Sequence, residues 1–317
     1  MTGALGEFDL IRRYFRNIQG HADALRLDLG VGDDCALISP NSGQQLAVSV
    51  DNLIEGRHFP AGAPAAELAW RALSVNVSDL NACGAEPLAF TLALTLPEAD
   101  EPWLAEFAAG LAEAAAHFGI DLIGGDTCRG PLSLCIQVMG QLPSGLALLR
   151  SGARAGDEVW VSGTLGGARA ALDVFDASVE DIGGEFLRAF YRPATPLMLG
   201  PALRGIASAA IDISDGLLAD LGHIATASGI GIELEAERLP LTQAMLDCFG
   251  AEKARQYAAT GGDDYQLAFT VPRARGGEMS AIAKACGIKL SQIGQCIEGE
   301  GVHCHNLSTD QTGWSHF

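Results

Sequence analysis

Residues 208–229, SAAIDISDGLLADLGHIATASG, join an apolar run to a second apolar segment through a short polar stretch. The first run predicts a buried strand. Ser214 is typical of a residue that caps a helix, and Gly229 is typical of the residue that follows one, so we expect a helix between them. The same order of strand, glycine turn and helix recurs in residues 158–175, EVWVSGTLGGARAALDVF. The second half of the chain is therefore predicted to be α/β.

Residues 44–54, QQLAVSVDNLI, predict a strand in the first half. Their alternating pattern places Ser49 and Asp51 side by side on the less apolar face. A long alanine-rich helix is expected over residues 102–118, and residues 120–126, IDLIGGD, predict a strand that stops at a tight turn. Together with a helix expected over residues 65–84, these elements give a first half that combines strands and two long helices.

Residues 65–84 predict the other long helix. One stripe of it, spaced i, i+4, i+7 and i+11, contains Leu68, Ala72, Val75 and Asp79. Asp79 would then lie on the apolar face, near the helix end where the dipole disfavours an anion. A buried carboxylate there needs a partner, and a metal cation is a suitable one. The alternative is that the stripe is rotated and Asp79 is exposed.

Residues 142–160 are rich in proline, glycine and serine and are typical of a linker. We therefore predict one domain over residues 1–145 and a second over residues 146–317. In the second domain, the alternation in DDYQLAFTV, residues 263–271, predicts a half-buried strand, and residues 276–288 predict a final helix.

The composition of the chain excludes several classes of function. It has 317 residues, 39 of them Asp or Glu, and a net charge of −19. A nucleic-acid surface needs a basic patch, which such a balance disfavours. No apolar run reaches the roughly 18 residues of a membrane span, and the N-terminal residues lack the apolar region of a secretory signal. We expect a cytoplasmic protein with neither a nucleic-acid nor a membrane partner.

The cysteines do not indicate a disulfide framework. There are eight, and none forms a C-x-x-C pair. His303 and His305 would share one face of a strand, but no second pair of ligands stands nearby in the sequence, so a zinc site is not favoured.

Six aspartates occur at predicted strand ends, in glycine turns or on an apolar stripe, where an unpartnered carboxylate is costly. They are Asp34, Asp51, Asp79, Asp126, Asp212 and Asp215. Carboxylates suit Mg²⁺, which usually takes one or two of them and completes its shell with water and phosphates. Six therefore predict more than one ion at a metal–phosphate site. The alternative for any single aspartate is ordinary turn chemistry.

Other nucleotide-binding signatures are absent from the sequence. There is no G-x-x-x-x-G-K-[ST] loop, and SGTLGG after the strand at residues 158–162 lacks the spacing G-x-G-x-x-G. No protein-kinase set of H-R-D and D-F-G is present. The glycine turn after that strand is better explained as a plain strand-to-helix connection.

With these residues considered, the chain resembles the thiamine-monophosphate kinase family. The resemblance extends over nearly the whole chain, through GVGDDCAL, NVSDLNACGAEPLAFTLALTLP, LIGGDTCRGPLS, RSGARAGD, AIDISDGLLADLGHI and GGDDYQLAFTV in that order. The family belongs to an ATP-binding superfamily that includes aminoimidazole ribonucleotide synthetase and selenophosphate synthetase. The resemblance implies that the γ-phosphate of ATP is transferred to thiamine monophosphate, which gives thiamine diphosphate.

The resemblance also implies a fold of class α+β with two α/β domains. The N-terminal strands would pair in a dimer-forming sheet or barrel, with ATP and metal bound in that domain, and the C-terminal domain would be an α/β sandwich. The partners implied are thiamine monophosphate, ATP and a second copy of the chain.

Site residues carry over from the family by position. The Mg²⁺ ligands would be the six aspartates named above together with Ser49 and Val50. The contacts to ATP would be Gly125, Asp126, Arg150 and Ser214. The contacts to thiamine monophosphate would be His58, Asp263 and Trp314. Asp51 and Asp126 would be the most important for catalysis, which would use metal and positioning without a general base.

Two positions depart from the family. It often has threonine where Val50 stands, so only the main-chain carbonyl is left there as a ligand. It commonly has glutamate where Asp263 stands, and the shorter side chain leaves its reach to the substrate in question. The alternatives are another enzyme of the superfamily, or a non-catalytic protein that binds divalent ions.

Overall fold

The computed structural model describes residues 7–18, 27–31, 35–181, 183–307 and 313. Asp34 and Trp314 lie outside these residues. The described residues form two compact units: one contains those up to Leu80 together with Ala85–Gly145, and the other contains Asn81–Gly84 and those from Leu146 onward. Both units combine strands and helices, which confirms the predicted α+β class with two α/β parts. No described helix is both long enough and apolar enough to span a bilayer.

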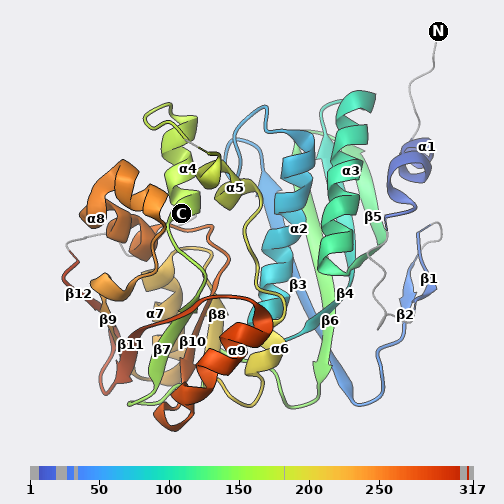
Figure 1. Cartoon of the computed structure of the whole chain (residues 1–317). Coiled ribbons are helices and arrows are strands. Elements are labelled where there is room, and N and C mark those ends of the chain that lie inside the picture. The colour runs from blue at the N-terminus through green and yellow to red at the C-terminus, as the bar shows by residue number, and fades with distance from the viewer. Residues whose placement is uncertain (1–6, 19–26, 32–34, 182, 308–312, 314–317) are drawn as a thin grey trace. The chain divides into compact units, whose positions relative to one another are not determined.

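The first unit is built on a four-stranded sheet in the order β3-β6-β4-β5. The strands are β3 (Gln44–Ile54), β6 (Ser133–Pro143), β4 (Glu86–Leu96) and β5 (Asp121–Arg129). Only β4 and β5 are parallel. Two long helices, α2 (Ala65–Ala82) and α3 (Glu101–Phe118), lie side by side over one face of the sheet (Figure 1). The smaller elements are α1 (Glu7–Leu10), η1 (Ile11–Phe15), β1 (Leu27–Leu29) and β2 (Leu37–Ile38).

Local sequence explains the position of α3. Pro102 lies in its first turn, and Gly119 ends it in the left-handed conformation, with φ 62°. Leu104, Phe107 and Leu111 are completely buried. Gly110 allows the close packing on α2, because a Cβ atom there would lie 2.3 Å from the carbonyl oxygen of Ala66.

Strand β3 packs with its more polar face inward. Ser49 and Asp51 are half-buried and face α2, whereas Val48 and Val50 are 52% and 54% exposed. The predicted alternation is confirmed. The exposure is the reverse of an ordinary amphipathic strand, in which apolar side chains face the core.

The second unit contains a six-stranded sheet in the order β12-β9-β11-β7-β10-β8. The strands are β7 (Glu158–Ser162), β8 (Ala209–Asp212), β9 (Gly231–Glu235), β10 (Leu267–Val271), β11 (Leu290–Ile297) and β12 (Gly301–His305). The helices are α4 (Gly167–Phe175), α5 (Glu185–Tyr191), α6 (Leu199–Leu203), α7 (Leu217–Ser228), η2 (Ala236–Arg238), α8 (Gln243–Thr260), η3 (Arg273–Glu278) and α9 (Met279–Cys286).

Two apolar clusters pack around this sheet. One combines α7 with Val159, Val161 and Ile232, and the other combines α6 and α9 with Leu267 and Phe269. Ala268 joins the first cluster, so β10 is buried on both faces. The prediction of a half-buried strand there was wrong, because helices cover both sides of the sheet.

Three predicted boundaries were also wrong. Strand β5 does not stop at a tight turn but continues to Arg129, because Gly125 lets it approach β4: a Cβ atom there would lie 2.0 Å from the carbonyl oxygen of Leu92. Gly216, and not Ser214, is the residue before α7. Strand β10 begins at Leu267, since Tyr265 has a left-handed backbone with φ 49°.

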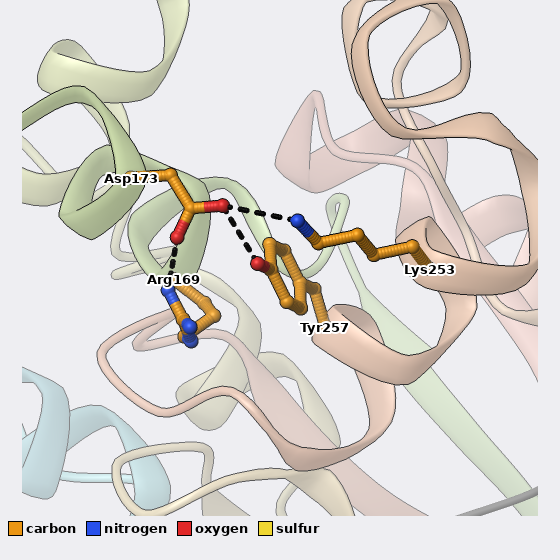
Figure 2. Close-up of polar contacts among 4 residues, drawn as sticks. All are labelled: Arg169, Asp173, Lys253 and Tyr257. Carbon is orange, nitrogen blue, oxygen red and sulfur yellow. Dashed lines mark hydrogen bonds and ion pairs between the residues drawn. The ribbon is translucent and has the colours of Figure 1, made fainter. Parts of the chain in front are cut away.

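Asp173 links α4 to α8 through a compact group of polar contacts (Figure 2). It accepts hydrogen bonds from Tyr257 Oη at 2.7 Å, Arg169 Nη1 at 3.0 Å and Lys253 Nζ at 3.3 Å. The guanidinium of Arg169 also lies 4.4 Å from the centre of the Tyr257 ring. Burial raises the pKa of Asp173, but the three hydrogen bonds outweigh it and hold the pKa below its ordinary value.

We expect Asp173→Asn to lower the free energy of unfolding by about 1 to 3 kcal/mol at pH 7, the usual range for hydrogen bonds to a charged group. Because the carboxyl pKa is lowered in the folded state, its contribution is present above the unfolded value of about 3.9 and is lost as the pH falls through the folded value. Urea unfolding from pH 7 to pH 3 measures this. Asp176→Asn, at an exposed position just beyond α4, is the control. A difference that does not change with pH would contradict the assignment.

Candidate functional site

Two of the predicted metal ligands in the first unit, Ser49 and Asp79, meet between β3 and α2, and a third, Asp51, lies nearby on β3. Ser49 Oγ donates to Asp79 Oδ2 at 2.5 Å, and Asp51 follows two residues later on the same strand face. Asp79 is half-buried, so the prediction of an inward-facing carboxylate is closer to the structure than the exposed alternative. These side chains offer hard oxygen donors, which fit Mg²⁺.

Asn76 was missed by sequence reasoning and lies beside this group. Its Oδ1 accepts from the Asp51 main-chain N–H at 2.9 Å, and its Nδ2 donates to the Ala72 carbonyl at 2.8 Å. The side chain is completely buried on α2. Asn76 lies three residues before Asp79 on the same helix, and that spacing was the signal available in the sequence. Its bond holds the backbone of Asp51 at the open edge of β3.

His58 lies in the turn that follows β3. Its ring Nδ1 accepts from the main-chain N–H of Ile54 at 3.0 Å, and the main-chain N–H of His58 donates to the Ile54 carbonyl at 2.9 Å. An imidazole that accepts at Nδ1 carries its proton on Nε2. The turn therefore fixes both the place of His58 and its tautomer.

Asp126 lies at the other edge of the same sheet. Asp51 is opposite Ile136, Ile136 is opposite Leu92, and Leu92 is opposite Gly125, the residue before Asp126. Three strand spacings of about 4.8 Å place these two edges about 14 Å apart. The sheet of one chain therefore does not bring Asp51 and Asp126 together. The side chain of Asp126 is exposed.

In the second unit, one carboxylate organises the polar loop after β8. Asp220 Oδ2 accepts from the main-chain N–H groups of Ser214, Asp215 and Gly216 at 3.0, 3.1 and 3.1 Å. Burial, followed by repulsion from Asp215, raises the pKa of Asp220 to about 7 against the lowering effect of these bonds. Asp212, at the end of β8, is buried. Sequence reasoning missed Asp220, which reads as a routine acidic residue in the first turn of α7.

A second buried carboxylate organises the loop before β10. Both oxygens of Asp264 lie within hydrogen-bond distance of the Gly166 N–H at the start of α4, at 3.0 and 2.9 Å. Burial raises the pKa of Asp264 well above its ordinary value. The neighbouring Asp263 has a left-handed backbone, with φ 69°, and its Oδ1 accepts from Tyr265 Oη at 3.0 Å.

These two loops are bonded directly to each other. The Asp263 N–H donates to the Ser214 carbonyl, and the Tyr265 N–H donates to the Ile213 carbonyl, both at 2.8 Å. Gly262 leaves no room for a side chain, because a Cβ atom there would lie 2.3 Å from the Ser214 carbonyl oxygen. The second unit thus brings together Asp212, Ser214, Asp215 and Asp263.

Of the two remaining predicted positions, Arg150 lies beside the C-terminal end of α7, away from these loops, and Trp314 is outside the described residues. Arg150 is exposed, and its carbonyl accepts from Ser228 Oγ at 3.2 Å. Gly313, the described neighbour of Trp314 in sequence, lies against the Asp215 carbonyl, where a Cβ atom would come within 2.9 Å.

The described residues do not assemble a complete metal site on their own. Within them, no three His, Cys, Asp or Glu side chains are grouped to hold an ion. His303 and His305 project from the same face of β12, and His305 Nε2 lies 3.8 Å from Glu233 Oε1. That pair does not constitute a zinc site.

This two-unit α/β architecture corresponds to a known class. Residues 32–142 match the family "AIR synthase related protein, N-terminal domain", and residues 154–305 match "AIR synthase related protein, C-terminal domain". The chain is therefore a two-domain protein of the AIR synthase related class.

More specific relatives cover the whole chain. Thiamine-monophosphate kinase of Salmonella typhimurium is 43% identical over 323 residues, which cover 99% of each protein. The crystal structure of thiamine-monophosphate kinase from Stenotrophomonas maltophilia K279a matches with a TM-score of 0.86 at 40% identity, over 96% of this chain and 98% of that one. AaThiL complexed with AMPPCP and TMP matches with a TM-score of 0.78 at 30% identity, over 99% and 97%. The chain belongs to the thiamine-monophosphate kinase family.

Proposed function

We propose that this protein phosphorylates thiamine monophosphate, with ATP as the phosphate donor. The observation that carries the proposal is the full-length similarity to thiamine-monophosphate kinases, one of which, AaThiL, is known in complex with AMPPCP and TMP. A phosphate oxygen of thiamine monophosphate attacks the γ-phosphorus of ATP. The bond from that phosphorus to the β,γ-bridging oxygen breaks, and ADP and thiamine diphosphate are the products.

The nucleophile in this reaction needs no general base. A phosphate monoester is already ionised near neutral pH, so the protein has to hold two anions in line and stabilise the charge that develops between them. A chain with a net charge of −19 repels both substrates unless cations offset its carboxylates. Mg²⁺ held by these carboxylates would supply that positive charge.

The residues that would hold Mg²⁺ offer suitable oxygen donors. In the first unit they are Asp34, Ser49, Asp51, Asp79, Asp126 and the carbonyl of Val50, and in the second Asp212 and Asp215. The pairing of Ser49 with Asp79 supports this assignment, because it holds two oxygen donors on one face of β3 beside Asp51.

The remaining roles concern the two substrates. We assign Gly125, Asp126, Arg150 and Ser214 to ATP, and His58, Asp263 and Trp314 to thiamine monophosphate. Tyr265 Oη holds Oδ1 of Asp263, so this short side chain presents its carboxylate in a defined direction. We also place the protein in the cytoplasm: all eight cysteines lie within the described residues and form no disulfide, as is usual in a reducing compartment.

Asp51→Asn and Asp126→Asn are each expected to lower kcat by about 100-fold or more, the scale on which lost charge stabilisation acts. ADP release with thiamine monophosphate as acceptor, measured over a Mg²⁺ titration, tests both the function and the two residues. Asp100→Asn is the matched control, because Asp100 is an exposed carboxylate at the start of α3 where asparagine is equally suitable. A variant with a near-normal rate at ordinary Mg²⁺ removes its residue from the site, and a wild-type protein that releases no ADP with this acceptor refutes the function.

Ser214→Ala is expected to raise the KM for ATP by about 2- to 10-fold, the value of one hydrogen bond. The Ser214 N–H is bonded to Asp220 and its carbonyl to Asp263, so we assign the nucleotide contact to its hydroxyl. The KM for thiamine monophosphate should change little. Ser144→Ala, which removes an exposed hydroxyl in the first unit, serves as control. Equal KM values for ATP in Ser214→Ala and wild type would exclude the contact.

We further propose that the protein is a homodimer formed through the first unit. Strand β3 is an edge strand, and it exposes a row of apolar side chains: Leu46, Val48, Val50 and Ile54. Such an edge is a template for pairing, and an exposed apolar row is typical of an interface. A second copy of the chain would give the edge of β3 a partner strand and would pack its own apolar side chains against this row.

Val48→Lys is therefore expected to shift the protein from dimer to monomer, because it places a charge in the covered row. Sedimentation at micromolar concentration measures the mass. Leu172→Lys, at a comparably exposed position on α4, should leave the dimer intact. A wild-type protein that sediments as a monomer contradicts the dimer, and dissociation by both variants contradicts the assigned surface.

A further inference from the structure

Three consecutive main-chain N–H groups point at a single oxygen in the loop before α7. They belong to Ser214, Asp215 and Gly216, and the oxygen is Asp220 Oδ2. A concave group of successive N–H groups normally attracts an anion, for example a phosphate. In this protein the acceptor is the side chain of Asp220, which is only 2% exposed. These amides are therefore occupied by the protein itself, and they fix the direction in which Asp215 leaves the backbone.

Asp264 likewise accepts from a main-chain N–H group and stabilises the neighbouring loop. Both of its oxygens lie within hydrogen-bond distance of the Gly166 N–H at the start of α4, and its own side chain is buried. The positive end of the helix stabilises this carboxylate. Asp263, the preceding residue, has a left-handed backbone that a non-glycine residue adopts only at a cost. The anchor at Asp264 holds that conformation in place.

The two anchored loops form one piece of structure. The Ser214 carbonyl accepts from the Asp263 N–H, and Gly262 packs against that same carbonyl. A displacement of the loop at Asp215 is thereby transmitted to the loop at Asp263.

We propose that Asp220 and Asp264 are positioning residues for phosphoryl transfer, which hold the loop that carries the Asp215 ligand and the loop that carries Asp263 at a fixed separation. This inference rests on the proposed function, in which Asp215 contributes to Mg²⁺ binding and Asp263 to the binding of thiamine monophosphate. Neither positioning residue contacts the reacting atoms. Each acts by satisfying main-chain N–H groups that would otherwise be buried without an acceptor.

The test compares alanine and asparagine at both positions in the full-length protein. Asp220→Ala is expected to lower kcat by about 10- to 100-fold and to raise the Mg²⁺ concentration for half-maximal rate, since a displacement of about 1 Å costs this much. Asp264→Ala is expected mainly to raise the KM for thiamine monophosphate. Asp220→Asn and Asp264→Asn keep one acceptor oxygen, so they should recover much of the loss. Because the loops are bonded together, the double alanine variant should lose less than the product of the two single losses.

Asp181→Ala is the matched control. Asp181 accepts from two consecutive main-chain N–H groups, those of Phe186 and Leu187, at the start of α5, so it has the same chemistry away from the two loops. It should lower the melting temperature and leave kcat, both KM values and the Mg²⁺ requirement unchanged. If the Asp220 and Asp264 variants behave in the same way, the two residues are only structural and the proposal is wrong. The asparagine variants decide the question if the alanine variants do not fold.

A binding measurement separates this proposal from the proposed function. If the wild-type protein makes no thiamine diphosphate, the function fails, and calorimetric titration with AMPPCP and Mg²⁺ tests the loops directly. Binding weakened at least 5-fold by Asp220→Ala, but not by Asp181→Ala, supports positioning. Equal affinities in wild type and Asp220→Ala overturn it.

Discussion

The hydrogen bonds from three consecutive main-chain N–H groups to Asp220 are the interaction on which the C-terminal part of the site depends. A carboxylate that leaves water must receive hydrogen bonds or a cation, and here the backbone supplies them. The same bonds satisfy amides at the start of α7, where no preceding turn of helix accepts them. The bend that separates Asp212 from α7 is thereby held at every amide from Ser214 to Gly216.

The aspartates of this acidic chain are of two kinds, which differ in burial and in what offsets their charge. Asp220 and Asp264 are buried and bonded to main-chain N–H groups, so they stabilise the conformation of the loops. Asp51, Asp79 and Asp215 are only half-buried, and they are among the residues that we propose to hold Mg²⁺. In the proposed reaction, the half-buried carboxylates would hold Mg²⁺, and the buried ones would hold the loops without competing for it.

The N-terminal sheet imposes a different constraint. Its order places β3 and β5 at opposite edges, so Asp51 and Asp126 belong to different margins of one sheet. Strand β3 directs its polar face toward α2 and leaves apolar side chains exposed on the other face. Both features are understandable if the sheet is completed by a second copy of the chain, which would cover the exposed row and give the open edges partners.

The sequence by itself determined the strand at residues 44–54, the long helices and the α/β repetition of the second half, because these follow from local periodicity and from residue types at turns. Only the tertiary structure decided which face of β3 is buried and that β5 continues through Gly124 and Gly125. It also decided that Asp220 and Asp264 accept hydrogen bonds from main-chain N–H groups of the loops. The physical reason is that these features depend on partners that are distant in the sequence. Asp51 is bonded to Asn76, Asp264 is bonded to Gly166, and Gly125 packs against Leu92, at separations of 25 to 98 residues. The preferences of single residues carry no information about such partners.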